Sequence, residues 1–221
     1  MKFVVIIPAR GGSKRFPDKN IYPLNNKPLI AYSIDYAKKN DLDVYVTTDS
    51  ESIAGIARKW GAGIIQRPAE LAGDYVSTAE TLQHATEYLI RNNVEFDYTI
   101  LLQPTNPLRP DKLLTDAKKI IGTEEYDSLM TVSPLKINFG RIVNDCFVPQ
   151  NFQYGQRSQD LETLYYVNGL LYVTKKEIIL NGLIVGNKMY TMIIDHLYGT
   201  IDIDTVDDLK YAELVINSRE E

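Results

Sequence analysis

Residues 3–20 read "FVVIIPARGGSKRFPDKN" and join a short apolar run to a basic loop that contains two adjacent glycines. Residues 3–7 are apolar and mostly β-branched, which is typical of a strand buried on both faces of a parallel sheet. The loop that follows carries four cationic side chains: Arg10, Lys14, Arg15 and Lys19. In an open parallel sheet, ligands bind beyond the carboxyl ends of the strands. The stretch therefore predicts an α/β fold in which this loop holds a ligand.

Strands and helices alternate along the rest of the first half of the chain. Apolar runs predict strands at 43–47, 63–66, 98–103 and 128–132. Helical periodicity predicts helices at 27–39, 50–60, 77–91 and 111–121. Ser77 and Glu80 have the spacing of a capping box at the start of the third of these helices. This alternation predicts a mostly parallel sheet with helices on both faces.

The alternation is interrupted between residues 134 and 166. This segment opens on a proline, has only short apolar pieces and contains the polar stretch "NFQYGQRSQDLE". It predicts a protruding hairpin or arm, and not a second full domain. Further strands are predicted at 170–174, 190–195 and 199–204, and a last helix at 205–218. We therefore expect a single domain, residues 1–221, with an arm at 134–166.

Composition narrows the class of protein. The chain has 221 residues, a formal net charge of -5 and one cysteine, Cys146. The acidic balance gives no field that attracts a nucleic-acid backbone, and no apolar run is long enough to span a bilayer. A single cysteine fits a reducing compartment, and the start of the chain lacks the pattern of a signal peptide. We expect a cytoplasmic protein that binds neither nucleic acid nor membrane.

Against this acidic background, the basic loop predicts a small anionic ligand. Gly11 and Gly12 permit positive φ, and consecutive backbone N–H groups in such a turn form an anion nest. The loop lacks a closing Gly-Lys-Ser/Thr and does not match Gly-x-Gly-x-x-Gly, so neither a Walker A loop nor a dinucleotide fold is indicated. A solvated basic loop is the simpler alternative, because turns use glycine pairs freely.

Several motifs together resemble one family. The basic loop, followed by "KPLI" at 27–30, resembles the opening of the acylneuraminate cytidylyltransferases. The same family is resembled, in order and spacing, by "TTD" at 47–49, "QRPAELAGD" at 66–74, "LLQPTNPLR" at 101–109 and "GTIDIDTVDDL" at 199–209. The resemblance implies a Rossmann-like nucleotide-diphospho-sugar transferase fold. It also implies a Mg²⁺-dependent reaction of CTP with a nonulosonic (sialic-type) acid, which gives a CMP-sugar and pyrophosphate.

The resemblance also implies how the nucleotide is held. It places the triphosphate on the loop, beside Arg10, Gly11, Gly12, Ser13, Lys14 and Lys19. It places the ribose and the cytosine beside Asn20, Arg67 and Thr78. Lys19 would lie nearest the α-phosphate, where charge builds up, and Arg10 and Lys19 are expected to be catalytic. Phosphoryl transfer depends on positioning and charge stabilisation, so these cations suit it without a nucleophilic side chain.

The motif "TIDIDT" at 200–205 alternates apolar and acidic residues. On a strand, Asp202 and Asp204 would share one face, where two like charges repel unless they are exposed or share a cation. An edge strand with a wet face explains the period alone. The resemblance favours a metal site, because carboxylates and substrate phosphates are ligands that Mg²⁺ prefers. Both aspartates are expected to bind the metal and to be catalytic, while the identity of a general base stays open.

On the sugar side, the resemblance implies contacts from Gln103, Arg157, Asn168 and Tyr172. It also implies that the arm inserts into a second copy of the chain, so a homodimer is expected. Ser158, Glu162 and Tyr166 depart from the family pattern, which leaves both N-acetylneuraminate and legionaminate-type acids open as the sugar. Two rival hypotheses remain: a nucleotidyltransferase for sugar 1-phosphates, and a catalytically silent nucleotide-binding protein.

Overall fold

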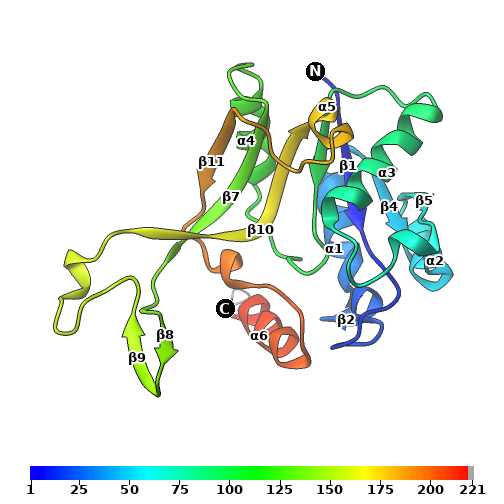
Figure 1. Ribbon diagram of the computed structural model, residues 1–221. Coiled ribbons are helices and arrows are strands. Elements are labelled where there is room, and N and C mark those ends of the chain that lie inside the picture. Colours follow the sequence, from blue (N-terminus) through cyan, green and yellow to red (C-terminus); the bar gives the residue numbers. More distant parts are fainter. Residues whose placement is uncertain (219–221) are drawn as a thin grey trace.

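The computed structural model describes residues 1–218, apart from the side chain of Ser158. A seven-stranded sheet forms its centre, in the order β11-β7-β10-β6-β1-β4-β5 (Figure 1). The bounds of these strands are β1 Phe3–Pro8, β4 Asp43–Thr48, β5 Gly63–Gln66, β6 Tyr98–Leu101, β7 Ser128–Leu135, β10 Leu164–Lys175 and β11 Met189–Ile193. β10 is antiparallel to both of its neighbours, and the other pairs of adjacent strands are parallel. The prediction of a mostly parallel α/β sheet is confirmed.

Helices cover both faces of the sheet (Figure 1). Their bounds are α1 Leu29–Lys39, α2 Glu51–Lys59, α3 Thr78–Arg91, α4 Leu113–Ile121, α5 Lys176–Leu180 and α6 Val206–Asn217. Apolar side chains of α1, α2 and α4 share a core cluster with Val5 and Ile7 of β1. Side chains of α3 and α5 form a second cluster with Val4 and Ile6. Successive residues of β1 therefore enter opposite layers, as expected of a strand buried on both faces.

The N-terminus of α3 is fixed by the predicted capping box, which is confirmed. The Ser77 hydroxyl accepts a hydrogen bond of 3.1 Å from the Glu80 N–H, and the Ser77 N–H donates to the Glu80 carboxylate over 2.7 Å. These bonds satisfy backbone donors that a helix start otherwise leaves free. The first turn of α3 is thereby held in place at the edge of the sheet where β1, β5 and β6 end.

The boundaries predicted for the arm are wrong at both ends. β7 continues to Leu135 and β10 already begins at Leu164, so Pro134 lies within the paired sheet. The register between β7 and β11 ends at Val132. Pro134 therefore lies where β7 has one paired edge, which is where a strand tolerates proline. The segment outside the sheet is 136–163, and we call it the arm.

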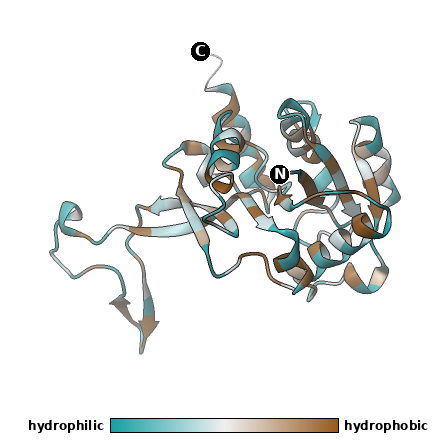
Figure 2. Ribbon diagram, turned by 90° about the horizontal axis from the view of Figure 1, so that it is seen from above, coloured by the Kyte–Doolittle hydropathy of each residue, from teal (hydrophilic) through white to brown (hydrophobic). Residues whose placement is uncertain are grey.

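The arm extends well away from the body of the molecule (Figures 1 and 2). It carries the hairpin of β8 Gly140–Val143 and β9 Cys146–Pro149. Several of its large apolar side chains are exposed: Ile137, Phe139, Ile142, Val143, Phe147, Val148 and Tyr154. Along residues 1–218, no helix is both long enough and apolar enough to cross a membrane.

The strand predicted at 199–204 is absent. Leu197–Thr200 forms a 3-10 turn, and residues 201–204 are extended without a sheet partner. The alternating pattern has another cause, because Ile201 and Ile203 are buried against the apolar side of α6 in a third core cluster. The N–H of Ile203 donates to the carbonyl of Thr105, which ties this segment to the end of β6. Packing against a helix thus gave the period that a strand would give.

Candidate active site

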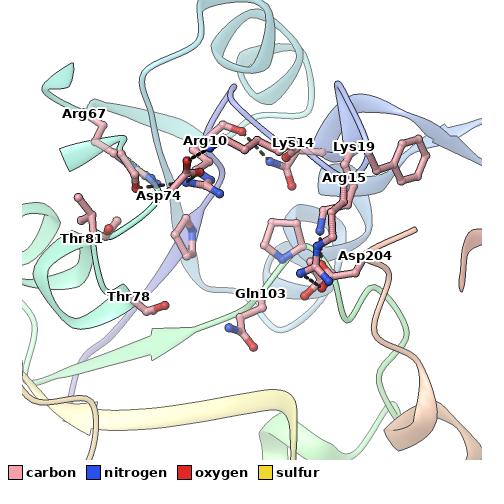
Figure 3. Close-up of a pocket in the computed structure, with 18 of the residues that line it drawn as sticks. Arg10, Lys14, Arg15, Lys19, Arg67, Asp74, Thr78, Thr81, Gln103 and Asp204 are labelled. Atoms are coloured by element: carbon pink, nitrogen blue, oxygen red, sulfur yellow. Dashed lines mark hydrogen bonds and ion pairs between the residues drawn. The ribbon is translucent and has the colours of Figure 1, made fainter. Parts of the chain in front are cut away.

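A cavity of about 300 Å³ opens at the carboxyl edge of β1, β5 and β6 (Figure 3). The loop after β1, the segment that leads into α3, the end of β6 and the segment before α6 contribute to its walls. Its charged lining residues are Arg10, Lys14, Arg15, Lys19, Arg67, Asp74 and Asp204. Five cations thus face two carboxylates, and this balance suits a multiply charged anion.

The two carboxylates divide four of the cations between them (Figure 3). Asp74 is paired with Arg10 at 3.0 Å and also with Lys14. Asp204 is paired with Lys19 at 2.6 Å and with Arg15 at 2.7 Å. The Lys19 side chain is only 11% exposed, whereas that of Lys14 is 78% exposed. Lys19 is therefore the cation of the loop that is most shielded from water.

The glycines of the loop do not form the predicted nest. Neither Gly11 nor Gly12 has a positive φ. The N–H of Gly11 donates to the Asp49 carboxylate over 2.9 Å, so it is not free for a ligand. A Cβ atom at residue 11 would lie 2.9 Å from the Cβ of Ser50, which is closer than real contacts allow. Gly11 thus lets the loop pack against the turn after β4, while Ser13 lines the cavity.

The residues expected around the base and ribose meet on one wall of the cavity. Arg67 is 5% exposed and donates to the carbonyl of Thr47 over 2.7 Å. Burial lowers the pKa of Arg67 to about 10, although nearby Asp49 opposes this effect. Asn20 is buried and donates to the carbonyl of Arg10 over 3.0 Å. Thr78, in the first turn of α3, lies opposite them across the cavity (Figure 3).

Asp202 lies beside this cavity rather than in its wall. Its side chain is exposed on one side, but surrounding protein atoms desolvate it and raise its pKa. The nearby charge of Asp204 also raises this pKa, while a hydrogen bond with Thr105 and the charge of Lys19 lower it. Both aspartates therefore act on the same patch of space, where a cation would relieve their repulsion.

A metal ion on this pair would need further ligands. Within residues 1–218, no cluster of three or more His, Cys, Asp or Glu side chains is arranged to hold a metal. Two carboxylates with oxygen donors from a phosphate or water are nevertheless a set that suits Mg²⁺. Asp202 and Asp204 therefore fit a metal that arrives with a phosphorylated ligand better than one bound by the protein alone.

Gln103 and Tyr172 lie on the side of the cavity that β10 approaches. Gln103 lines the cavity directly. Gly169, in the irregular part of β10, has a φ of 72°, and a Cβ atom there would lie only 2.7 Å from Gln103 Oε1. Tyr172 is half-buried on β10, and its pKa is raised by burial and then by the charge of Asp202. Glutamine, tyrosine and aspartate thus surround one end of the cavity.

Asn168 was expected beside the sugar, but its side chain is 4% exposed and fully engaged within the protein. Its Oδ1 accepts hydrogen bonds from the hydroxyl of Thr131 and the N–H of Leu170, at 2.6 and 3.1 Å. Its Nδ2 donates to the hydroxyl of Ser133 over 2.9 Å. The structure gives Asn168 a part in holding β7 and β10 together, and not a place in the cavity wall.

Arg157 is likewise not brought to this cavity. It lies in the arm, its side chain is 71% exposed, and it pairs with Asp160 over 2.7 Å. The expectation that Arg157 joins the other site residues is wrong for a single copy of the chain. The physical reason is that the arm extends away from the sheet and makes its own local contacts (Figure 2).

Four residues around the site were not predicted. Arg15 and Asp74 line the cavity, and both stand inside motifs that the resemblance uses. Arg109 is buried and donates to the carbonyls of Leu170 and Gln103 and to the hydroxyl of Ser33. Asn106 donates to the carbonyls of Asn168 and Ile201. The motif "LLQPTNPLR" contained both supporting residues, but only the fold shows which backbone groups they hold.

The fold and the cavity together define an enzyme of the nucleotidyltransferase class. Residues 4–212 match the model of the family described as Cytidylyltransferase. The chain belongs to the cytidylyltransferase family.

Curated relatives support this membership. The pseudaminic acid cytidylyltransferase of Campylobacter jejuni is 31% identical, over 97% of this chain and 96% of its own length. The CMP-N,N'-diacetyllegionaminic acid synthase of Legionella pneumophila is 32% identical, over 100% of this chain and 99% of its own length. The N-acylneuraminate cytidylyltransferase of Streptococcus agalactiae is 31% identical over 94% of this chain, which spans 52% of that relative. The predicted resemblance to this family is confirmed.

A solved structure supports the fold. A CMP-2-keto-3-deoxy-manno-octonic acid synthetase complexed with CTP matches with a TM-score of 0.72 and 17% identity. The match covers 99% of this chain and 100% of the other. The predicted nucleotidyltransferase fold is confirmed.

Proposed function

We propose that this protein transfers the CMP group of CTP to the anomeric hydroxyl of a nonulosonic acid and releases pyrophosphate. The observation that carries the proposal is the convergence of Arg10, Lys14, Arg15 and Lys19 on one cavity whose rim holds Asp202 and Asp204. Relatives named for pseudaminic, legionaminic and acylneuraminic acids support the class of acceptor.

The nucleotide would lie across the cavity from one wall to the other. Arg67, Asn20 and Thr78 would hold the cytosine and ribose, since they lie together on the wall formed by β5 and α3. The loop would hold the triphosphate through Arg10, Ser13, Lys14 and Lys19, with Gly11 and Gly12 shaping its backbone. Charge-assisted hydrogen bonds of this kind are stronger than neutral ones.

In the reaction, the anomeric oxygen attacks the α-phosphorus, the bond to the bridging oxygen of pyrophosphate breaks, and the hydroxyl proton is lost. Negative charge on the phosphoryl oxygens and the leaving group must be stabilised. Lys19 suits this role because its ammonium group is largely shielded from water, where electrostatic interactions are strong. Arg10 would stabilise the departing pyrophosphate. The side chain that accepts the proton is left open, with Asp204 as a candidate.

Mg²⁺ is proposed as the cofactor, held by Asp202, Asp204 and phosphate oxygens. When bound, it would neutralise charge on the triphosphate. Asp204 is paired with Lys19 and Arg15 through both of its oxygens, so the triphosphate would draw these cations away and free the carboxylate. Phosphate binding and metal binding would thereby support each other.

The acceptor would bind where Gln103 and Tyr172 approach Asp202. Asn168 would act at a distance, by holding the backbone of β10 in place. Arg157 would reach the sugar carboxylate only from a second copy of the chain. A homodimer formed through the arm is therefore proposed, and the exposed apolar side chains Ile137, Ile142, Phe147 and Tyr154 support it. A cytoplasmic location is proposed because the single cysteine fits a reducing compartment.

The test is pyrophosphate release from CTP and Mg²⁺ with a panel of acids: N-acetylneuraminate, a legionaminate, pseudaminate and the eight-carbon Kdo. Release with one nonulosonic acid, and its loss in Asp202→Ala, is the expected result. Asp207→Ala is the matched control, because Asp207 is exposed on α6 and pairs with Lys210. Binding of CTP without turnover of any acid would contradict the proposed reaction.

A further inference from the structure

Asp74 is a carboxylate in the wall of a cavity that otherwise attracts anions. It accepts from Arg10 at 3.0 Å and pairs with Lys14, and its side chain is 35% exposed. The same arginine also donates to the carbonyl of Gly73 over 3.1 Å. Asp74 therefore holds, through oxygen atoms, two cations that a phosphate would also bind through oxygen atoms.

The segment that carries Asp74 is held in place by few other contacts. Residues 72–76 lie between the 3-10 turn Ala69–Leu71 and α3, outside any helix or strand. Tyr75 is fully exposed, and a single hydrogen bond from the N–H of Val76 to the carbonyl of Gly73 closes the turn. The ion pairs to Arg10 and Lys14 thus provide a large share of the contacts that keep this segment against the loop.

Exposed ion pairs of this kind contribute little to stability, because water solvates the separated charges well. A ligand with several negative charges competes for Arg10 and Lys14 much better than a ligand with one. From these contacts we infer that Asp74 is an internal competitor of the triphosphate, which sets how strongly the site prefers multiply charged ligands. Filling the site with a triphosphate releases Asp74 and the segment 72–76.

Asp74 differs in this respect from Asp204. The backbone N–H of Asp204 is held by Asp208 over 3.0 Å, at the capping box of α6, and Asp204 lies beside a second aspartate. Asp74 has no second carboxylate that is placed with it to share a metal, within the part of the chain described. Its charge therefore opposes the ligand, whereas that of Asp204 is proposed to attract a cation.

The inference rests on the proposed function for the identity of the nucleotide, but not for the charge effect. The experiment is calorimetric titration of pyrophosphate, CTP and cytidine into the wild type and Asp74→Asn, in chelator and at low salt. Removing one negative charge next to the ligand is expected to tighten pyrophosphate and CTP binding roughly tenfold. Cytidine, which has no charge, is expected to bind both variants equally.

Asp116→Asn is the matched control, because Asp116 is an exposed aspartate that pairs with Lys119 on α4, away from the cavity lining. The gain in Asp74→Asn is also expected to shrink at high salt, since the Debye length falls from about 10 Å at 0.1 M to about 3 Å at 1 M. Equal or weaker binding of pyrophosphate by Asp74→Asn would overturn the inference, since Asp74 would then order the cations for the ligand. Pyrophosphate binding without any CTP binding would instead count against the proposed function and leave the comparison of variants intact.

Discussion

The ammonium group of Lys19 donates a hydrogen bond of 2.6 Å to Asp204, which lies 185 residues further along the chain. This bond joins the loop after the first strand to the segment before the last helix. Asp204 is held in turn by its backbone N–H, which donates to Asp208. The loop that binds phosphate and the carboxylates proposed to bind metal are therefore in direct contact, so that each can affect the charge of the other.

Replacing Lys19 by methionine is expected to lower kcat by about a hundredfold to a thousandfold, the range for loss of one donor to a developing charge. The stem of methionine is apolar and of similar length, so packing changes little. Steady-state rates of pyrophosphate release measure the effect. Lys119→Met on α4 is the control, because Lys119 forms an exposed ion pair away from the cavity lining. An unchanged kcat in Lys19→Met would exclude Lys19 from the transition state.

Removal of divalent metal by a chelator is expected to abolish turnover, and added Mg²⁺ is expected to restore it. Asp202→Asn and Asp204→Asn are each expected to lower activity by at least a hundredfold and to raise the Mg²⁺ concentration needed for half-maximal rate. Asp207→Asn should leave both values unchanged, since Asp207 pairs with Lys210 on the first turns of α6. A normal Mg²⁺ response in both site variants would rule out the proposed ligands.

Arg109 is expected to be a stability residue that supports the site from behind. Its guanidinium is 5% exposed and donates only to neutral oxygens, on Leu170, Ser33 and Gln103. Lysine cannot reproduce three diverging donors, so Arg109→Lys should leave buried carbonyls unsatisfied and reduce the free energy of unfolding by about 2–4 kcal/mol. Denaturant unfolding measures this. Arg91→Lys, on the exposed end of α3, should change it by less than about 0.5 kcal/mol.

The sequence predicted the sheet well because burial on both faces leaves a clear signal in residues 3–7 and in the later strands. It also predicted the loop cations, because four charges so close together are visible without a structure. It failed at 199–204, since packing against α6 gives the same alternation as a strand. It also could not show that Asn168 is buried or that Arg157 lies far out on the arm. Both facts depend on contacts between segments distant in sequence.

Stability should depend on pH through the capping box of α3. The pKa of Glu80 lies below its ordinary value because the Ser77 N–H, and then the Ser77 hydroxyl, donate to its carboxylate. A carboxyl with a lower pKa in the folded state binds fewer protons there than in the unfolded chain. Its contribution is therefore present above an unfolded pKa of about 4.3 and is lost as the pH falls through the folded value.

Glu80→Gln removes this dependence, so the difference in free energy of unfolding between the wild type and Glu80→Gln is expected to shrink as the pH falls below neutrality toward 4. Urea unfolding of both proteins at several pH values measures the difference, and other carboxyl groups cancel in it. Glu87→Gln, at a position of α3 without this cap, should show a difference that does not follow the same course. A difference that grows in acid would contradict the assigned direction of the Glu80 pKa.

Gly169 and Gly155 offer a comparison that separates backbone strain from crowding at the sugar side of the cavity. Both have positive φ, 72° and 81°, so alanine is strained at either position by about 1–2 kcal/mol. At Gly155 nothing lies within 4 Å of the added Cβ, whereas at Gly169 it would meet Asn106 Oδ1 at 2.5 Å and Gln103 Oε1 at 2.7 Å. Only Gly169→Ala should therefore displace Gln103.

Because Gln103 is proposed to face the acceptor, Gly169→Ala is expected to lower kcat/KM for the nonulosonic acid at least tenfold, while the KM for CTP changes less than threefold. Gly155→Ala should lose a similar amount of backbone stability and retain kcat/KM. Kinetics with each substrate varied in turn, together with thermal unfolding of both variants, measure the two effects separately. Equal losses of kcat/KM in the two variants would show that strain alone accounts for the change. A loss confined to CTP would instead move Gln103 to the nucleotide side of the cavity.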